Sequence, residues 1–243
     1  DAVLGDLDAI ELVCLWSDEL GTAEVWYRLL NIGVPVAASA GSDVMTDFYR
    51  TMAVGTTRVY ANTGGAVNWP AYTSALKDGR TFVTNGPMIT LEVGGSGPGD
   101  VVEGGTVPYT VTVASAVPFD RIELLVNGQV VETGPGLADT GTTTLSGELD
   151  LPTGGWVAAR ALGGETRWPS MDSYPFAHAS PVWIGERGSV DPSAAAQAAR
   201  ELLGALEVAR QRLVAGYGAV EIPNLTARFD AARDRLERLA EGR

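Results

Sequence analysis

Cysteine and histidine are almost missing from this sequence: Cys14 and His178 are the only residues of their kinds among 243. A lone cysteine excludes a disulfide within the chain, and it also excludes a structural zinc site built from several cysteines. Hydrolytic metal centres gather several histidine and carboxylate ligands, and this chain can supply one imidazole at most. Its own side chains therefore cannot build a histidine-rich hydrolytic metal centre.

Long apolar runs and basic clusters are lacking too. No stretch approaches the roughly 18 consecutive apolar residues of a membrane-spanning helix. The formal net charge is −13, from 17 basic and 30 acidic residues, and no basic patch stands out. Because nucleic acids and anionic membranes attract clustered Lys and Arg, the sequence predicts no binding to either. A hydrophobic fraction of 45% and a charged fraction of 19% are typical of a folded protein.

Residues 1–86 alternate strand and helix signals. The predicted segments are a strand at 9–15, a helix around 25–30, a strand at 34–40, a short strand at 57–60, a helix at 69–78 and a strand at 81–84. Mainly apolar strands that alternate with helices predict a parallel α/β sheet or barrel.

The pattern changes over residues 87–186, where strand candidates follow one another without a helix between them. The candidates are residues 89–93, 109–114, 121–126, 129–132, 143–149 and 155–161. Asn127-Gly128 between two of them is a strong signal for a two-residue hairpin. Many short strands at this spacing predict an antiparallel β-sandwich.

Residues 187–243 read as a helical hairpin. Asp191 before Pro192 places an N-cap residue ahead of a proline at the first helical position. Apolar residues then recur at helical spacing through the first helix and again through a second helix at 223–241. A short loop between two amphipathic helices predicts an αα-hairpin.

Asp43 is the first candidate for chemistry. It follows the apolar strand at 34–40, and open α/β sheets and α/β barrels place ligands beyond the carboxyl ends of such strands. Small residues around it leave room for a ligand or an ion. The alternative is that Asp43 stabilises the next turn through an Asx hydrogen bond. The spacing alone leaves both interpretations open.

An ordered set of segments resembles the CehA/McbA family of metallohydrolases, within the polymerase-and-histidinol-phosphatase (PHP) superfamily. The matching segments are WYRLLNIG at 26–33, ASAGSD at 38–43, RVY at 58–60, ALKDGRTFVTNGP at 75–87 and FAHASPV at 176–182. The matches are dense over residues 21–93, sparse through the predicted sandwich, and return at 176–184. The closing helical pair is also similar to that family.

The resemblance implies a distorted β/α barrel that holds divalent metals, with water attacking an ester, amide or phosphoester. By similarity, Asp43 matches an aspartate that ligates metal, and a carboxylate there suits Zn²⁺, Mn²⁺ or Fe²⁺. Many superfamily members read Asp-x-His at this point, whereas Met45 stands at the second position here. The His-x-His motif of the superfamily would lie upstream of Asp1. The resemblance therefore covers only the C-terminal portion of such an enzyme.

Three further residues are candidates for binding a substrate. His178 could reach a substrate, or it could be a buried histidine whose ring nitrogens are satisfied by the backbone. Arg58 could hold a substrate anion or pair with a nearby carboxylate. Asn85 could line the mouth of the predicted barrel, as Arg58 could. It also lies in a turn signal between two predicted domains. No residue is assigned a catalytic role.

The predicted organisation is a partial barrel (1–86), a β-sandwich (87–186) and a helical hairpin (187–243). The predicted function is that of a C-terminal fragment of a metal-dependent hydrolase with a small-molecule substrate. Because a partial barrel leaves an unpaired strand edge, we expect it to bind the missing N-terminal barrel segment or a second copy of the chain.

Two alternatives remain. One is a PHP relative that has lost its metal. The other is a non-catalytic β-sandwich binding module, in which Trp156, Trp168 and Trp183 could form a carbohydrate platform or be buried core.

Overall fold

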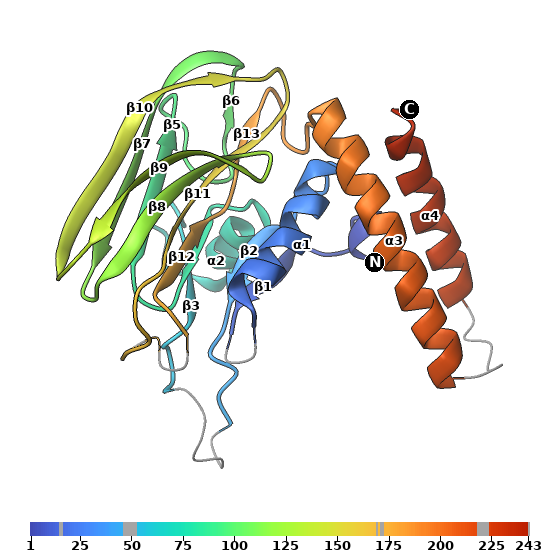
Figure 1. The fold of residues 1–243 in the computed structure, drawn as a ribbon, viewed down its shortest axis with the longest axis horizontal. Coiled ribbons are helices and arrows are strands. Elements are labelled where there is room, and N and C mark those ends of the chain that lie inside the picture. The colour runs from blue at the N-terminus through green and yellow to red at the C-terminus, as the bar shows by residue number, and fades with distance from the viewer. Residues whose placement is uncertain (15–16, 46–52, 169, 171–172, 218–223, 243) are drawn as a thin grey trace.

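The computed structural model describes residues 1–14, 17–45, 53–168, 170, 173–217 and 224–242. Figure 1 shows the strand-rich part on one side and two long helices on the other, with β1, α1 and β2 between them. The first stretch of chain contains η1 (Ala2–Leu4), β1 (Ala9–Val13), α1 (Glu19–Asn31), β2 (Ala37–Ala40), β3 (Arg58–Ala61), α2 (Trp69–Lys77) and β4 (Thr81–Thr84). The second contains β5 (Met88–Val93), β6 (Val101–Val102), β7 (Gly105–Ser115), β8 (Phe119–Val126), β9 (Gln129–Leu137), β10 (Gly141–Leu151), β11 (Gly155–Leu162), β12 (Phe176–Ala179) and β13 (Val182–Ile184). The third contains α3 (Pro192–Tyr217) and α4 (Leu225–Ala240).

Most strands belong to two sheets that pack face to face (Figure 1). The larger sheet has eight strands in the order β3-β4-β12-β11-β13-β6, with β8 pairing to β11 and β9 pairing to β8. The smaller sheet has the order β10-β7-β5. Within these sheets the described pairs are antiparallel except for β13 with β6.

The core between these sheets follows from strand periodicity. Side chains alternate between the two faces of a strand, so Ile89, Leu91 and Val93 of β5 all point to one side, where they are buried. They join Ile122 and Leu124 of β8 in one hydrophobic cluster. Burying apolar area at about 25 cal/mol per Å² makes this cluster a main source of the stability of the sandwich.

The segment β1–α1–β2 forms a separate unit around a parallel two-stranded sheet. Asp18 caps α1, because its Oδ1 accepts a hydrogen bond from the backbone N–H of Gly21 at 3.1 Å. Trp26 on the inner face of α1 is fully buried, and its Nε1 donates to the carbonyl of Val36 at 2.8 Å. The first contact fixes the start of α1, and the second ties the helix to the segment that leads into β2.

Side-chain hydroxyls join β2 to the larger sheet. The Thr81 hydroxyl donates to the carbonyl of Ala38 at 3.0 Å, and the Ser180 hydroxyl accepts from the N–H of Ala38 at 3.1 Å. The two hydroxyls lie 2.8 Å from each other, and both residues are buried. At Ala38, therefore, β2 is joined to the larger sheet through side-chain hydroxyls. Its strand pairing through backbone hydrogen bonds is with β1.

The helices α3 and α4 pack against each other, and α3 also contacts α1. Ala198, Ala199 and Leu202 of α3 and Leu236 of α4 belong to the same core cluster as α1 and β2. None of the helices in the described part of the chain combines the length and apolar character that crossing a bilayer requires. Two predicted element ends, Leu15 and Pro223, lie outside the described residues.

The predicted fold class, which places a partial β/α barrel before the sandwich, is wrong. Among the described strands of residues 1–86 only β1 and β2 pair in parallel; β3 and β4 pair antiparallel, and β4 pairs antiparallel with β12. A strand of only four residues carries no signal for its direction, and here the pairing with β12 decides the direction of β4. The larger sheet therefore crosses residue 86, while the division of the chain into units at 86 and 186 stays a prediction.

Candidate functional site

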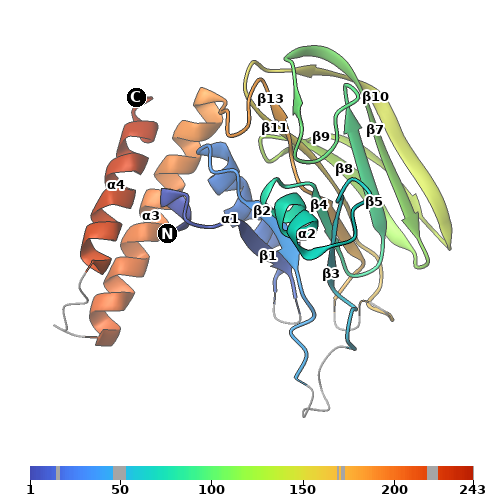
Figure 2. The same ribbon diagram turned by 180° about the vertical axis from the view of Figure 1, so that it is seen from behind.

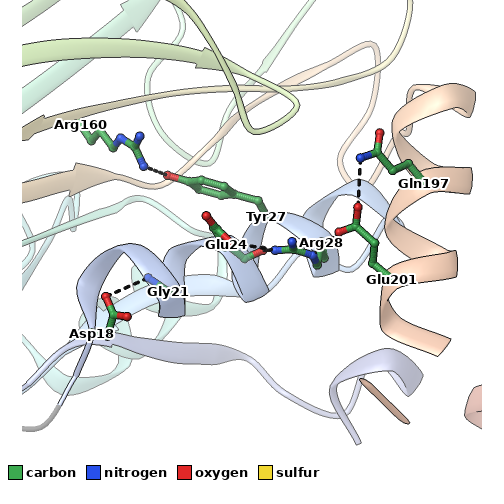
Figure 3. A network of polar contacts seen from close by, with 8 residues as sticks. All are labelled: Asp18, Gly21, Glu24, Tyr27, Arg28, Arg160, Gln197 and Glu201. Carbon is green, nitrogen blue, oxygen red and sulfur yellow. Dashed lines mark hydrogen bonds and ion pairs between the residues drawn. The ribbon is translucent and has the colours of Figure 1, made fainter. Parts of the chain in front are cut away.

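A cleft of about 640 Å³ lies between α1, the β8–β9 turn and the start of α3. Polar side chains dominate its lining, and Figure 3 shows part of it, with α1 facing α3. The lining residues are Glu24, Tyr27, Arg28, Asn31, Val126, Asn127, Gly128, Gln129, Val131, Asp191, Ser193, Ala194, Gln197, Ala198 and Glu201.

The β8–β9 turn forms one wall of the cleft. Asn127 and Gly128 have φ angles of 51° and 83°, the left-handed pair of a type I′ hairpin turn. The turn is held in place because Asn31 Nδ2 donates to the carbonyl of Asn127 at 3.1 Å, while Asn127 Oδ1 accepts from the N–H of Trp156 at 2.9 Å. The hairpin predicted from the sequence is thus confirmed, and it packs against Tyr27 of α1.

One ion pair crosses the cleft between α1 and α3, and a second lies along α1. Arg28 Nε lies 2.5 Å from Glu201 Oε2, and Arg28 Nη1 lies 3.6 Å from Glu24 Oε2. Gln197 Nε2 donates to the other oxygen of Glu201 at 3.0 Å (Figure 3). Hydrogen bonds from Gln197 and Arg28 hold the pKa of Glu201 below its usual value. The lining carries three carboxylates, from Glu24, Asp191 and Glu201, against one guanidinium.

Asp191 sits where α3 enters the cleft. Its Oδ1 accepts a hydrogen bond from the N–H of Ala194 at 2.8 Å, and Pro192 is the first residue of α3. The predicted N-cap is therefore confirmed. The cap also places a carboxylate at the positive end of the helix dipole, an arrangement that stabilises the start of α3.

A buried network runs beneath the cleft from Tyr27. The Tyr27 hydroxyl lies 2.5 Å from His178 Nε2, and His178 Nδ1 lies 2.8 Å from the carbonyl oxygen of Ala179. A carbonyl only accepts, so Nδ1 carries the proton and Nε2 accepts from the tyrosine. Arg160 Nη1 in turn donates to the Tyr27 oxygen at 3.3 Å, and Arg160 Nε donates to Glu123 Oε2 at 2.6 Å.

Burial and pairing set the charges in this network. Burial lowers the pKa of His178 to about 3, so the ring is neutral at pH 7. Burial also raises the pKa of Tyr27, which stays protonated. Burial acts to raise the pKa of Glu123, but hydrogen bonds from Arg121 and Arg160 outweigh it and leave the pKa lowered. No member of the network titrates near neutral pH, so its contacts hold α1 against the sheet instead of exchanging protons with a ligand.

The structure places His178 and Asn85 in the core. Both are fully buried, and both ring nitrogens of His178 are taken by Tyr27 and the backbone. Asn85 Nδ2 donates to the carbonyl of Tyr174 at 2.8 Å, and its Oδ1 accepts from the N–H of Phe176 at 2.7 Å. Asn85 thereby connects the end of β4 to β12. The substrate-binding roles of both residues stay predictions.

Arg58 and Asp43 lie together in a different place, at the ends of β3 and β2. The hydroxyl of Ser42 donates to the carbonyl of Thr57 at 3.2 Å, which brings their two segments side by side. Arg58 Nη1 donates to the carbonyl of Gly55 at 2.6 Å, and its guanidinium lies 5.7 Å from the ring centre of Tyr60. Asp43 is exposed, with a φ of 48°. The structure therefore does not gather the four predicted site residues into one site: His178 and Asn85 lie in the core, and Asp43 and Arg58 belong to neighbouring segments at the ends of β2 and β3.

The described residues do not form a metal centre around Asp43. Within the ranges that the structure describes, no group of three or more His, Cys, Asp or Glu side chains could hold a metal ion. The one imidazole of the chain is committed to Tyr27 and Ala179 in the core. The metal predicted at Asp43, whether Zn, Mn or Fe, has no support from these residues.

Sequence reasoning missed the residues that line the cleft. Glu24 and Arg28 stand four residues apart on α1, which indicates a solvated helix face with an ion pair along it. Gln197 and Glu201 have the same spacing on α3. The sequence therefore shows a polar face on α1 and another on α3, but it does not indicate that the two faces lie opposite each other.

Comparisons with known proteins identify no family. No family model matches the chain, and a search of curated proteins finds no relative. Among solved structures, a lytic polysaccharide monooxygenase from Jonesia denitrificans matches with a TM-score of 0.28 and 16% identity, over 65% of this chain and 93% of that one. A TM-score this low carries no argument about fold or function. The predicted membership in the CehA/McbA family, and with it the PHP hydrolase class, is wrong: no comparison supports it, and the described strands form no parallel barrel.

Proposed function

We propose that this chain is a binding module that holds a small cationic ligand in the cleft between α1, the β8–β9 turn and α3. The observation that carries the proposal is the lining: three carboxylates face one guanidinium in a space of about 640 Å³. Small-molecule sites commonly enclose about 300–1,000 Å³ and use a few placed polar groups. The cleft matches that size.

The ligand class follows from charge and hydrogen-bonding capacity. Carboxylate and amide oxygens accept hydrogen bonds, and an ammonium or guanidinium group supplies donors with the complementary charge. Arg28 illustrates the fit, because its own guanidinium already bonds Glu201 and approaches Glu24. A net charge of −13 further raises the local concentration of cations around the molecule.

The hydrolase hypothesis stays separate and untested. No contact among the described residues supports a metal-dependent enzyme acting on an ester, amide or phosphoester, and a binding module needs no metal. Association with a missing N-terminal segment or with a second copy also stays a prediction. Its physical basis is β1, which pairs with β2 on one edge only. Gel filtration at several concentrations would test the second copy.

Titration calorimetry with putrescine, spermidine and choline tests the cleft. We expect saturable binding at low salt that weakens as salt screens the carboxylates. Glu24→Gln should weaken binding by roughly threefold, the size expected for one partly exposed charge. Glu148→Gln on β10 removes an equally negative, exposed side chain outside the cleft and should leave binding unchanged.

Two further arms separate binding from metal chemistry. Binding should persist in EDTA, because the proposed site uses no metal ion. It should also persist in Asp43→Ala, because Asp43 does not line the cleft. If no probe binds, or if Glu24→Gln and Glu148→Gln behave alike, the proposal is wrong. Loss of binding in EDTA would indicate a metal instead.

A further inference from the structure

Two aromatic rings lie together on the surface of α2. Trp69 is 74% exposed, and its ring stacks against Tyr72 with centroids 5.6 Å apart and planes 30° apart. The spacing of three residues puts both rings on one side of the helix. One face of the indole meets Tyr72, and the high exposure leaves the rest of the indole open to solvent.

The turn that carries Trp69 is well fixed. Asn68 caps α2, with its Oδ1 accepting from the N–H of Ala71 at 2.9 Å, and Pro70 occupies the first turn. The Thr73 hydroxyl bonds the carbonyl of Trp69 at 3.1 Å. Figure 2 shows α2 in front of β2, apart from α3 and α4. These contacts fix the backbone that carries the indole, which lowers the entropy lost when a ligand binds.

We infer that Trp69 and Tyr72 form a second binding site, separate from the cleft, that takes a neutral polysaccharide. The face of an aromatic ring carries partial negative charge, and the C–H groups on one face of a pyranose ring carry partial positive charge. A sugar ring can therefore lie flat on the open indole face while its hydroxyls remain hydrated.

Size and charge favour this ligand over others. A stable protein interface buries roughly 800 Å² on each partner, which is far more than one stacked ring pair offers. The net charge of −13 repels acidic polysaccharides, and neither Trp69 nor Tyr72 carries a charge to pair with a cationic one, so the sugar chain should be uncharged. The three tryptophans considered from the sequence cannot form such a platform together, because Trp156 and Trp183 are 0% and 2% exposed.

Affinity electrophoresis in native gels tests the inference, because this acidic chain migrates readily. The gels contain laminarin, hydroxyethyl cellulose or galactomannan, with polygalacturonate as the anionic comparison. We expect at least one neutral polysaccharide to retard the chain, and Trp69→Ala to weaken the interaction by roughly fivefold or more. Tyr72→Phe should bind like the unaltered chain, because it keeps the ring.

Trp168→Ala is the matched control. Trp168 is 64% exposed but lies in the loop between β11 and β12, so its removal should not change the retardation. Glu24→Gln in the cleft should not change it either. The inference is overturned if no neutral polysaccharide retards the chain, if Trp69→Ala and Trp168→Ala have the same effect, or if polygalacturonate retards the chain more strongly. Circular dichroism of each variant verifies that the fold is kept.

Discussion

Lowering the pH from 8 to 5 should destabilise this protein through a single side chain, His178. It is the only histidine in the sequence, so no other side chain has an ordinary pKa between these limits. It is fully buried, with Nε2 facing the Tyr27 hydroxyl and Nδ1 facing the carbonyl of Ala179. The Ala179 carbonyl accepts the Nδ1 proton, and the nearby Arg160 guanidinium disfavours a second positive charge.

The sign and size of the effect follow from proton binding. Burial lowers the pKa of His178 from 6.5 to about 3 in the folded chain, while the unfolded chain keeps the ordinary value. Between these two values only the unfolded state takes up a proton, so stability is full above about pH 6.5 and is lost as the pH falls below it. Each pH unit costs about 1.4 kcal/mol, so the 1.5 units from 6.5 to 5 cost about 2 kcal/mol.

Urea denaturation followed by tryptophan fluorescence measures this loss at pH 8, 6.5 and 5. The free energy of unfolding should be equal at the two higher values to within about 0.5 kcal/mol and about 2 kcal/mol lower at pH 5. The comparison is His178→Gln, which cannot titrate: it should be less stable at pH 8 but nearly independent of pH down to 5. If His178→Gln does not fold, Tyr27→Phe keeps the buried imidazole and should retain the pH dependence.

The reasoning would be refuted by a free energy of unfolding that changes by less than about 0.5 kcal/mol between pH 8 and 5. An equal slope in His178→Gln would also refute it, because the proton would then bind elsewhere. Stopping at pH 5, above the ordinary pKa of carboxyl groups, keeps their contribution to the measurement small. The pKa of Glu123 lies below its ordinary 4.5, so its contribution is present above that value and is lost only at lower pH.

Three substitutions test other contacts by the same urea measurement at pH 8. Glu123→Gln leaves the Arg160 guanidinium, 13% exposed, without its charge partner and should cost about 3 kcal/mol; a cost below 1 kcal/mol would mean that solvent replaces the carboxylate. Asn85→Ala removes the bonds to two backbone groups at β12 and should cost about 2–3 kcal/mol, whereas a neutral effect would show that water reaches them. Gly128→Ala forces a side chain into φ 83° and should cost about 1–2 kcal/mol; an unchanged stability would contradict the type I′ turn.

The sequence predicted best where the signal is local. Asn127-Gly128 specifies a turn because both residues tolerate positive φ, and the structure has φ angles of 51° and 83° there. Asp191 before Pro192 specifies a helix start for a similar reason. The direction of β3 and β4 was not predictable. Strands of four residues look the same in parallel and antiparallel sheets, and the pairing of β4 with β12 joins residues more than 90 positions apart.

The candidate site depends on contacts that no local pattern records. The ion pair between Arg28 and Glu201 spans 173 positions, and each residue alone looks like part of a solvated helix face. His178 shows the opposite problem. Its surroundings in sequence fitted both a ligand-binding residue and a core residue, and only the Tyr27 hydroxyl, supplied from α1, distinguishes the two.

Tyr27 connects the core to the cleft. Its ring lines the cleft beside the β8–β9 turn, while its hydroxyl accepts from Arg160 and contacts His178 beneath. The ion pair of Arg160 with Glu123 is only slightly exposed, so it resists salt better than the exposed pairs on α1. Since α1 carries Tyr27 together with Glu24 and Arg28, the contacts that hold Tyr27 also fix the helix face that carries Glu24 and Arg28. The cleft is therefore built before a ligand arrives, and the rigidity of its wall comes from charges buried on the large sheet.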